Sequence, residues 1–181
     1  MNCNFNPFPV LETERLTLRQ LTLNDDNEVF FQRSDEEMNK YVGNPPAKSI
    51  EEAREWINKI NSFAVNGESI FWGATLKGEE KLIGGFCIWN LSHEHTRAEV
   101  GFGIYPVHQN KGYMTEILRA GLQYGFEQMQ LSTIEAHTHA KNISSLKVLE
   151  KYNFKLKEDQ QSHEGSHYLA FELHRHSFRS A

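Results

Sequence analysis

Two periodicities divide the chain into strands and helices. Apolar and polar residues alternate along several short runs rich in β-branched and aromatic side chains, a pattern typical of strands buried on one face. Strands are expected over 15–21, 70–76, 82–91, 97–105, 131–139 and 168–173. Short polar segments join the three consecutive runs between 70 and 105, and these runs predict an antiparallel meander.

Elsewhere, apolar residues recur every three and four positions, which is the spacing of one helical face. The clearest helix begins at the capping pattern Ser49-Ile-Glu-Glu52 and ends at Asn66-Gly67. Further helices are expected after Asn24, over 112–129 and over 142–153. Strands cluster early and helices interleave later, so the order predicts an α+β fold: a mixed, mostly antiparallel sheet of six or seven strands flanked by about four helices.

The composition fits one folded domain. The chain has 181 residues, of which 39% are hydrophobic and 12% aromatic, and this is enough apolar surface for a core without disulfides or metals. We expect a single domain over 1–181 with its core at about 15–173, a polar loop at 160–166 and a tail after Leu173.

Charge and cysteine content narrow the functional classes. A formal net charge of −5 without a basic tract makes nucleic acid a poor partner. The two cysteines, Cys3 and Cys87, favour a reducing compartment. Residues 1–10 lack the features of a signal peptide, and no apolar run approaches the roughly 20 residues of a membrane helix. We therefore expect a cytoplasmic protein without a membrane partner.

The segment from Arg97 to Glu116 predicts a ligand-binding unit made of a strand, a polar loop and the start of a helix. Along the strand, apolar side chains alternate with Glu99, Gly101 and Gly103, so one face is apolar and the other is almost bare. Two glycines on one strand face favour a bulge or the close approach of a ligand.

The loop after this strand has features of a phosphate site. Gly112 stands just before a helix, where backbone N–H groups and the helix dipole attract anions. Gly112 leaves room for an anion at the main chain, and Lys111 adds a positive charge. By itself, this pattern is also that of an ordinary loop before a helix.

In combination, these motifs resemble the RimJ/RimL branch of the GNAT acetyltransferases. The stretch 109–114, Gln-x-x-Gly-x-Met, is similar to the Arg/Gln-x-x-Gly-x-Gly/Ala loop that holds the coenzyme A pyrophosphate in that family. Further likenesses are Glu14-Arg-Leu-Thr-Leu-Arg19, Ala98-Glu-Val-Gly-Phe102, Gly112-Tyr-Met-Thr-Glu116 and Asn142-x-x-Ser145 with the turn at Asn153-Phe154. The sequence departs from the family pattern at Met114 and Asn153, where a small residue and a glycine are usual.

The resemblance implies a three-layer GNAT fold and an N-acetyltransferase that uses acetyl-CoA and no metal. An amine, on a protein N-terminus or a small molecule, would attack the thioester directly, with Glu99 as general base and Ser145 as proton donor to the sulfur. Coenzyme-binding residues would be Gly103, Ile104, Gln109, Asn110, Lys111, Gly112, Tyr113, Met114, Thr115, Asn142 and Ser145. A backbone N–H near Gly103 or Ile104 would stabilise the oxyanion. The enzyme would be a monomer or a homodimer.

Ordinary structural roles are open to the same residues. Glu99 could be a solvated carboxylate that pairs with Arg97 or Lys81. Asn142 could serve only as a helix cap, and Ser145 only as a first-turn hydroxyl.

Two residue types that often mark active sites are interpreted as structural. His137 and His139 share a strand face, but no third ligand stands at a metal-binding spacing. Cys87 lies between Phe86 and Ile88 in an apolar run, which favours a core thiol over a nucleophile.

Two other functions compete with acetyl transfer. A regulatory module that binds acyl-CoA without catalysis would keep the loop at 109–114 and would not need Glu99 or Ser145. An interaction protein would use the sheet edge, and that use can coexist with catalysis. The acceptor would be selected by the loop at 34–48, whose mixed charges fit a cationic acceptor and a solvated surface equally well.

Overall fold

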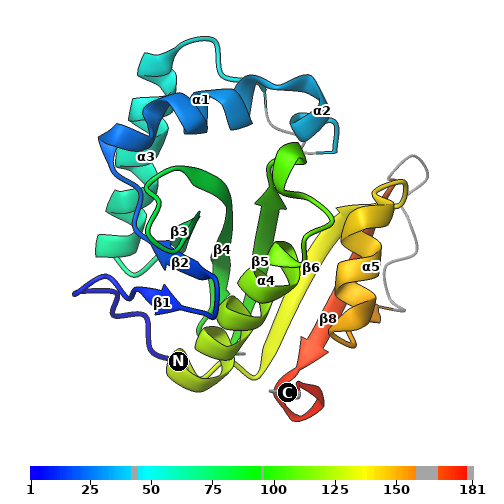
Figure 1. Ribbon diagram of the computed structural model, residues 1–181. Helices are drawn as coiled ribbons and strands as arrows, with labels where there is room; N and C mark the ends of the chain where they lie inside the picture. Colours follow the sequence, from blue (N-terminus) through cyan, green and yellow to red (C-terminus); the bar gives the residue numbers. More distant parts are fainter. Residues whose placement is uncertain (42–44, 95, 158–166, 179–181) are drawn as a thin grey trace.

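A computed structural model of the chain describes residues 1–41, 45–94, 96–157 and 167–178 (Figure 1). The predicted polar loop at 160–166 lies outside these residues, as does part of the 34–48 segment. The described residues form one sheet with helices packed against both of its faces.

Within the described residues, eight strands form the sheet in the order β1-β2-β3-β4-β5-β6-β8-β7. The strands are β1 (Leu11–Glu12), β2 (Leu16–Arg19), β3 (Ile70–Leu76), β4 (Leu82–Ser92), β5 (Arg97–Ile104), β6 (Thr133–His139), β7 (Lys155–Leu156) and β8 (Tyr168–His174). Only β5 and β6 pair in parallel, and all other neighbours are antiparallel. The prediction of a mixed, mostly antiparallel sheet in an α+β fold is confirmed.

The helices are α1 (Asp26–Ser34), α2 (Glu36–Asn39), α3 (Ile50–Val65), α4 (Tyr113–Gln123) and α5 (Ile143–Lys151), with short turns η1 (Leu23–Asp25), η2 (Pro106–His108) and η4 (Arg175–Ser177) and the π-helical turn η3 (Tyr124–Gln128). The capping pattern before α3 forms in part. The Ser49 side chain accepts a hydrogen bond from the Glu52 N–H, while the Glu52 carboxylate accepts from the N–H of Lys48, one residue before the N-cap, at 2.9 Å. The helix predicted over 112–129 is α4 continued by η3.

The elements that the sequence did not predict are all short. β1 and β7 have two residues each, and α2 has four, so none is long enough to show a hydrophobic period. The prediction of a tail after Leu173 was also wrong. β8 runs to His174 and η4 follows, after which Phe178 packs against Phe126 with ring centroids 5.2 Å apart.

Two hydrophobic clusters hold the layers together. The larger packs α4 and α5 onto one face of the sheet and includes Phe86 and Leu149. Phe86 can lie against α4 because position 121 is a glycine, and any side chain at Gly121 would collide with its ring. The smaller cluster packs α1 and α3 onto the other face and includes Val29 and Ile57. The sheet therefore separates a face covered by α4 and α5 from a face covered by α1 and α3.

Candidate active site

The parallel pairing between β5 and β6 ends halfway along β5. It joins residues 97–100 of β5 to residues 133–136 of β6. β5 then continues to Ile104 in contact with β4, while β6 continues to His139. The two strands therefore separate, and Figure 1 shows them diverging with the start of α4 in front of the gap.

The loop at 109–112 leads from η2 into α4 and is shaped by two left-handed residues. Gly112, the N-cap of α4, has φ of 81°, a conformation that glycine adopts without strain, and Asn110 has φ of 61°. No side chain among the described residues caps α4, whereas Ser49 caps α3 and Asn142 caps α5. The first N–H groups of α4 are thus available to an anion.

Both departures from the family pattern are accommodated by the fold. The side chain of Met114 is partly buried and packs against the larger hydrophobic cluster. Asn153 has φ of 61°, the left-handed conformation that a glycine would supply there. The neighbouring loop residues Gln109 and Lys111 are exposed to solvent.

The start of α5 carries the other predicted coenzyme residues. The Asn142 side-chain oxygen accepts a hydrogen bond from the Ser145 N–H at 3.2 Å, which is the capping role that the sequence also allowed. This bond uses the oxygen only, so the amide NH2 of Asn142 is a separate donor. At the other end of α5, the Tyr152 hydroxyl donates to the Thr115 carbonyl at 2.6 Å and ties α5 to the first turn of α4.

Glu99 lies on the opposite face of the sheet from α4, next to the point where β5 and β6 separate. Its side chain is only 12% exposed, and its Oε1 atom lies 3.6 Å from Nδ1 of His137 on β6. Burial raises the pKa of Glu99 above its ordinary value, and His137 and a hydrogen bond from Asn90 offset this only in part. Glu99 therefore holds a proton more readily than an exposed glutamate does.

The alternative in which Arg97 neutralises Glu99 is wrong. The Arg97 guanidinium forms an ion pair with Glu135 and lies 3.5 Å from a carboxylate oxygen of Glu172. No ion pair among the described residues joins Lys81 to Glu99. The side chain beside Glu99 is instead the imidazole of His137.

His137 is the residue near Glu99 that sequence reasoning missed. The sequence pattern placed it with His139 on one strand face, where the pair was weighed as metal ligands and interpreted as structural. Its position beside Glu99 follows from the parallel register, which sets Glu99 opposite Glu135, two residues before His137. Knowing that β5 and β6 are neighbours would have been sufficient to find it.

The backbone N–H of Ile104, and not that of Gly103, points into the gap between β5 and β6. The Tyr105 N–H donates to the Ile83 carbonyl of β4 at 2.8 Å. Successive residues of a strand direct their N–H groups to alternate edges, so Gly103 shares the direction of Tyr105, and Ile104 faces the other edge. A Cβ at Gly103 would meet no atom within 4 Å, so the sheet face is open at this position.

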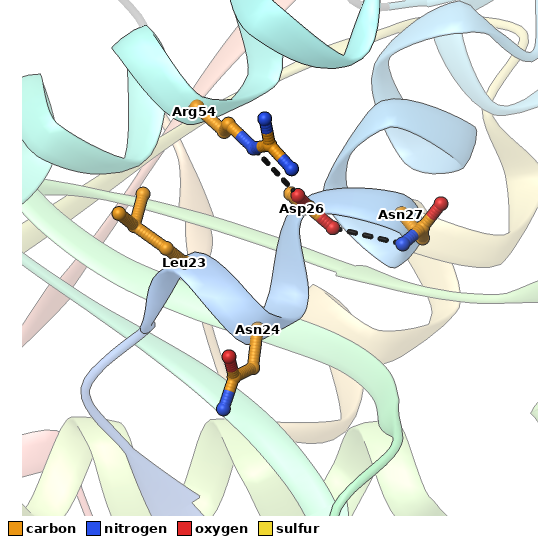
Figure 2. A pocket seen from close by; sticks show the side chains of 5 residues that line it. All are labelled: Leu23, Asn24, Asp26, Asn27 and Arg54. Atoms are coloured by element: carbon orange, nitrogen blue, oxygen red, sulfur yellow. Dashed lines mark hydrogen bonds and ion pairs between the residues drawn. The ribbon is translucent and has the colours of Figure 1, made fainter.

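Two hollows lie on the surface near these elements. One, of about 320 Å³, is lined by Glu99 together with Asn90, Ser92, Arg97, Ala98, Glu135 and Lys157. The other, of about 520 Å³, lies where α1 begins beside α3, and Figure 2 shows its charged groups turned toward each other. There the Arg54 Nε atom is 2.7 Å from Asp26 Oδ2. The first hollow contains a predicted catalytic residue, and the second contains none.

The described residues do not support a nucleophilic cysteine, a metal site or a membrane helix. Burial raises the pKa of the Cys87 thiol to about 12, so it is not an activated nucleophile. No group of three or more His, Cys, Asp or Glu side chains in the described part of the chain could hold a metal ion. None of the helices formed by those residues combines the length and apolar character needed to cross a bilayer.

Known proteins resemble this chain in sequence and in fold. Residues 15–155 match the family described as Acetyltransferase (GNAT) domain. An uncharacterized N-acetyltransferase of Bacillus subtilis, YoaA, is 35% identical over 147 residues, which cover 81% of this chain and 83% of that protein.

Two solved structures illustrate the likeness in fold. A GNAT acetyltransferase from Bacillus anthracis is 25% identical, with a TM-score of 0.77 over 93% of this chain and 99% of that chain. RimL, a ribosomal L7/L12 α-N-protein acetyltransferase solved with coenzyme A, is 14% identical, with a TM-score of 0.80 over 92% of this chain and 98% of that one.

Proposed function

This chain belongs to the GNAT acetyltransferase family, and from that premise we propose that it transfers the acetyl group of acetyl-CoA to a primary amine by direct attack. The observation that carries the proposal is the position of Glu99. This buried carboxylate stands where β5 and β6 separate, with the uncapped start of α4 on the other face of the sheet.

The coenzyme is proposed to bind on the face covered by α4 and α5. Its pyrophosphate accepts hydrogen bonds from the N–H groups of residues 112–115, which no side chain among the described residues caps. The exposed residues 109–111 border the same site, and Lys111 adds positive charge. Its pantetheine arm runs through the gap between the strands toward the amide of Asn142.

The acceptor amine is proposed to reach the thioester from the Glu99 face. The amine nitrogen forms the new bond to the acetyl carbon, the carbon–sulfur bond breaks, and the thiolate leaves. Glu99 takes the proton from nitrogen, and Ser145 gives its hydroxyl proton to sulfur and regains one from solvent. The N–H of Ile104 stabilises the negative charge that develops on the carbonyl oxygen. The raised pKa of Glu99 suits a base that works near neutral pH.

The acceptor is proposed to be a protein N-terminal amine, as in RimJ/RimL-type enzymes, or a peptide or small-molecule amine. Segments near the Glu99 face carry both charge signs. In α2, for example, Lys40 pairs with Glu37 at 3.4 Å. Because both charge signs are present, these segments favour neither a cationic nor an anionic acceptor.

Turnover against a panel of N-terminal peptides, polyamines and aminoglycosides tests the proposal. Thiol release from acetyl-CoA should rise with at least one amine, and mass spectrometry should find that amine heavier by one acetyl group. Binding of acetyl-CoA without acetylation of any amine would favour the regulatory module. An acetylated hydroxyl or thiol in place of an amine would overturn the proposed acceptor class.

A further inference from the structure

Two motifs that are far apart in the sequence meet at the start of α4. The turn at 13–15 precedes β2, and Glu116 lies in the first turn of α4. One Glu116 carboxylate oxygen accepts hydrogen bonds from the Thr13 hydroxyl and from the Arg15 backbone N–H, the latter at 2.8 Å. The other oxygen accepts from the Arg15 guanidinium, with Nε at 2.8 Å and Nη2 at 2.7 Å.

The same guanidinium also reaches the loop before α4. Its Nη1 atom donates to the Lys111 carbonyl at 3.0 Å, and its central carbon lies 4.5 Å from the centre of the Tyr113 ring. Arg15 therefore bridges the last residue before Gly112 and the first turn of the helix. We call Thr13, Arg15 and Glu116 the α4 bracket.

The α4 bracket determines which way the loop turns its N–H groups. A trans peptide directs its C=O and its N–H to opposite sides. Because Arg15 holds the Lys111 carbonyl, the N–H of Gly112 in the same peptide unit is directed away from Arg15. Rotation of this peptide would put a carbonyl oxygen in place of that N–H, and an oxygen would repel a phosphate.

The α4 bracket also cancels a charge that would oppose the coenzyme. Glu116 carries a carboxylate within the first turn of α4, and its side chain is 15% exposed. Unpaired, this carboxylate would repel a pyrophosphate at the same helix end. The Arg15 guanidinium neutralises it, with its Nε and Nη2 atoms both in contact with one carboxylate oxygen.

We infer that Arg15 and Glu116 are positioning residues for the coenzyme: they orient the peptide between Lys111 and Gly112 toward the pyrophosphate without touching the reacting atoms. This inference rests on the proposed function, because it requires the pyrophosphate to bind at the start of α4. It makes a separate claim, namely that the affinity of the site depends on a contact made by the turn before β2.

Arg15→Met and Arg15→Lys test the inference in calorimetric titrations with acetyl-CoA. Arg15→Met should raise Kd about tenfold, and Arg15→Lys by less, because an ammonium can pair with Glu116 but cannot also hold the Lys111 carbonyl. The matched control is Arg54→Met, which removes the guanidinium of the Asp26 ion pair drawn in Figure 2. That control should lower thermal stability and leave the Kd for acetyl-CoA unchanged.

A second ligand separates positioning from general loss of structure. S-acetyl-pantetheine has the thioester arm but no pyrophosphate, and its binding is followed by NMR titration. Arg15→Met should change its Kd by less than about twofold, because the contacts that are lost serve only the pyrophosphate. Equal weakening of both thioesters, or an unchanged Kd for acetyl-CoA in Arg15→Met, would overturn the inference. A wild-type protein that binds acetyl-CoA no better than S-acetyl-pantetheine would instead refute the proposed pyrophosphate site, and the inference with it.

Discussion

Glu99 and Glu116 are two glutamates near the proposed coenzyme site that are similarly buried but have different partners. Glu116 has four contacts from Thr13 and Arg15. Burial alone would raise its pKa, but these hydrogen bonds and the charge of Arg15 outweigh burial and lower the pKa. For Glu99 burial prevails over His137, whose Nδ1 atom lies 3.6 Å from Oε1, and over a hydrogen bond from Asn90, so the pKa is raised.

The difference assigns the two carboxylates to different tasks. A carboxylate that is held charged by an arginine keeps its proton affinity low and serves as a fixed anchor. A carboxylate whose burial outweighs its partners has a raised pKa and accepts a proton more readily, which suits a general base. We therefore propose that the same residue type serves as a structural anchor on one face of the sheet and as the general base on the other.

Glu99→Gln should produce the largest change in activity. The amide cannot accept the amine proton, so kcat should fall by a factor of about 10² to 10⁴, while the Kd for acetyl-CoA stays the same. Steady-state thiol release and calorimetry measure the two quantities. Glu150→Gln, an exposed position on α5, is the control and should leave both unchanged. Comparable kcat values for Glu99→Gln and the control would refute the role of Glu99.

Ser145→Ala should have the next largest effect. Loss of the proton donor to the sulfur should lower kcat by a factor of about 10 to 100, because water can replace the hydroxyl in part. The Asn142 cap accepts from the backbone N–H of residue 145, so the substitution leaves α5 intact. Circular dichroism checks that the helix is intact, and thiol release measures kcat. A kcat equal to that of the wild type would limit Ser145 to the role of a first-turn hydroxyl.

The pH dependence of kcat/KM should show the protonation of Glu99. The base must be deprotonated, so kcat/KM should fall about tenfold per pH unit below the pKa of Glu99. Because that pKa is raised, this limb should lie above the ordinary glutamate value of about 4.3. His137, Glu135 and Lys157 also face this region, so His137→Gln is measured alongside to isolate the imidazole. A limb that persists in Glu99→Gln would belong to another group.

The smallest expected effects are on thermal stability, which should shift in opposite directions in Glu116→Gln and Glu99→Gln. A lowered pKa means that Glu116 contributes stability above its unfolded pKa, and this is lost as pH falls through its folded pKa. Glu116→Gln should therefore lower Tm by about 2–4 °C at pH 7, and the difference should disappear in acid.

The pKa shift of Glu99 has the opposite effect on stability. Its folded pKa is raised, so its contribution is most favourable below the unfolded pKa and is lost as pH rises through the folded pKa. Glu99→Gln should raise Tm by about 1–2 °C at pH 7. Calorimetric scans at pH 7 check both variants, and shifts of equal sign would contradict the contrast between the two carboxylates.

Sequence periodicity predicted the long elements and could not predict the short ones. α3, α4 and the strands from β3 to β5 have enough residues to show a period of 3.6 or 2, and their hydrophobic faces match the two clusters. β1, β7 and α2 are held by their neighbours and have no pattern of their own. For example, the Asn39 side chain of α2 donates to the Gln32 carbonyl of α1.

For the site, sequence motifs predicted residue types but not the partners of those residues. Glu99 and the loop at 109–112 were identified from their motifs, but His137 and Arg15 come from elements whose adjacency no local pattern encodes. The same limit explains why Arg97, two residues from Glu99, was considered as its partner. In the fold, the Arg97 guanidinium binds Glu135 on the adjacent strand.

The most direct test is a calorimetric titration of the wild-type chain and of Glu99→Gln with acetyl-CoA, followed by thiol release from the same samples with an accepted amine. We predict one acetyl-CoA bound per chain with equal Kd in both proteins, and thiol release that depends on Glu99. A wild-type chain that does not bind acetyl-CoA, or a Glu99→Gln variant that releases thiol at the wild-type rate, would contradict the account.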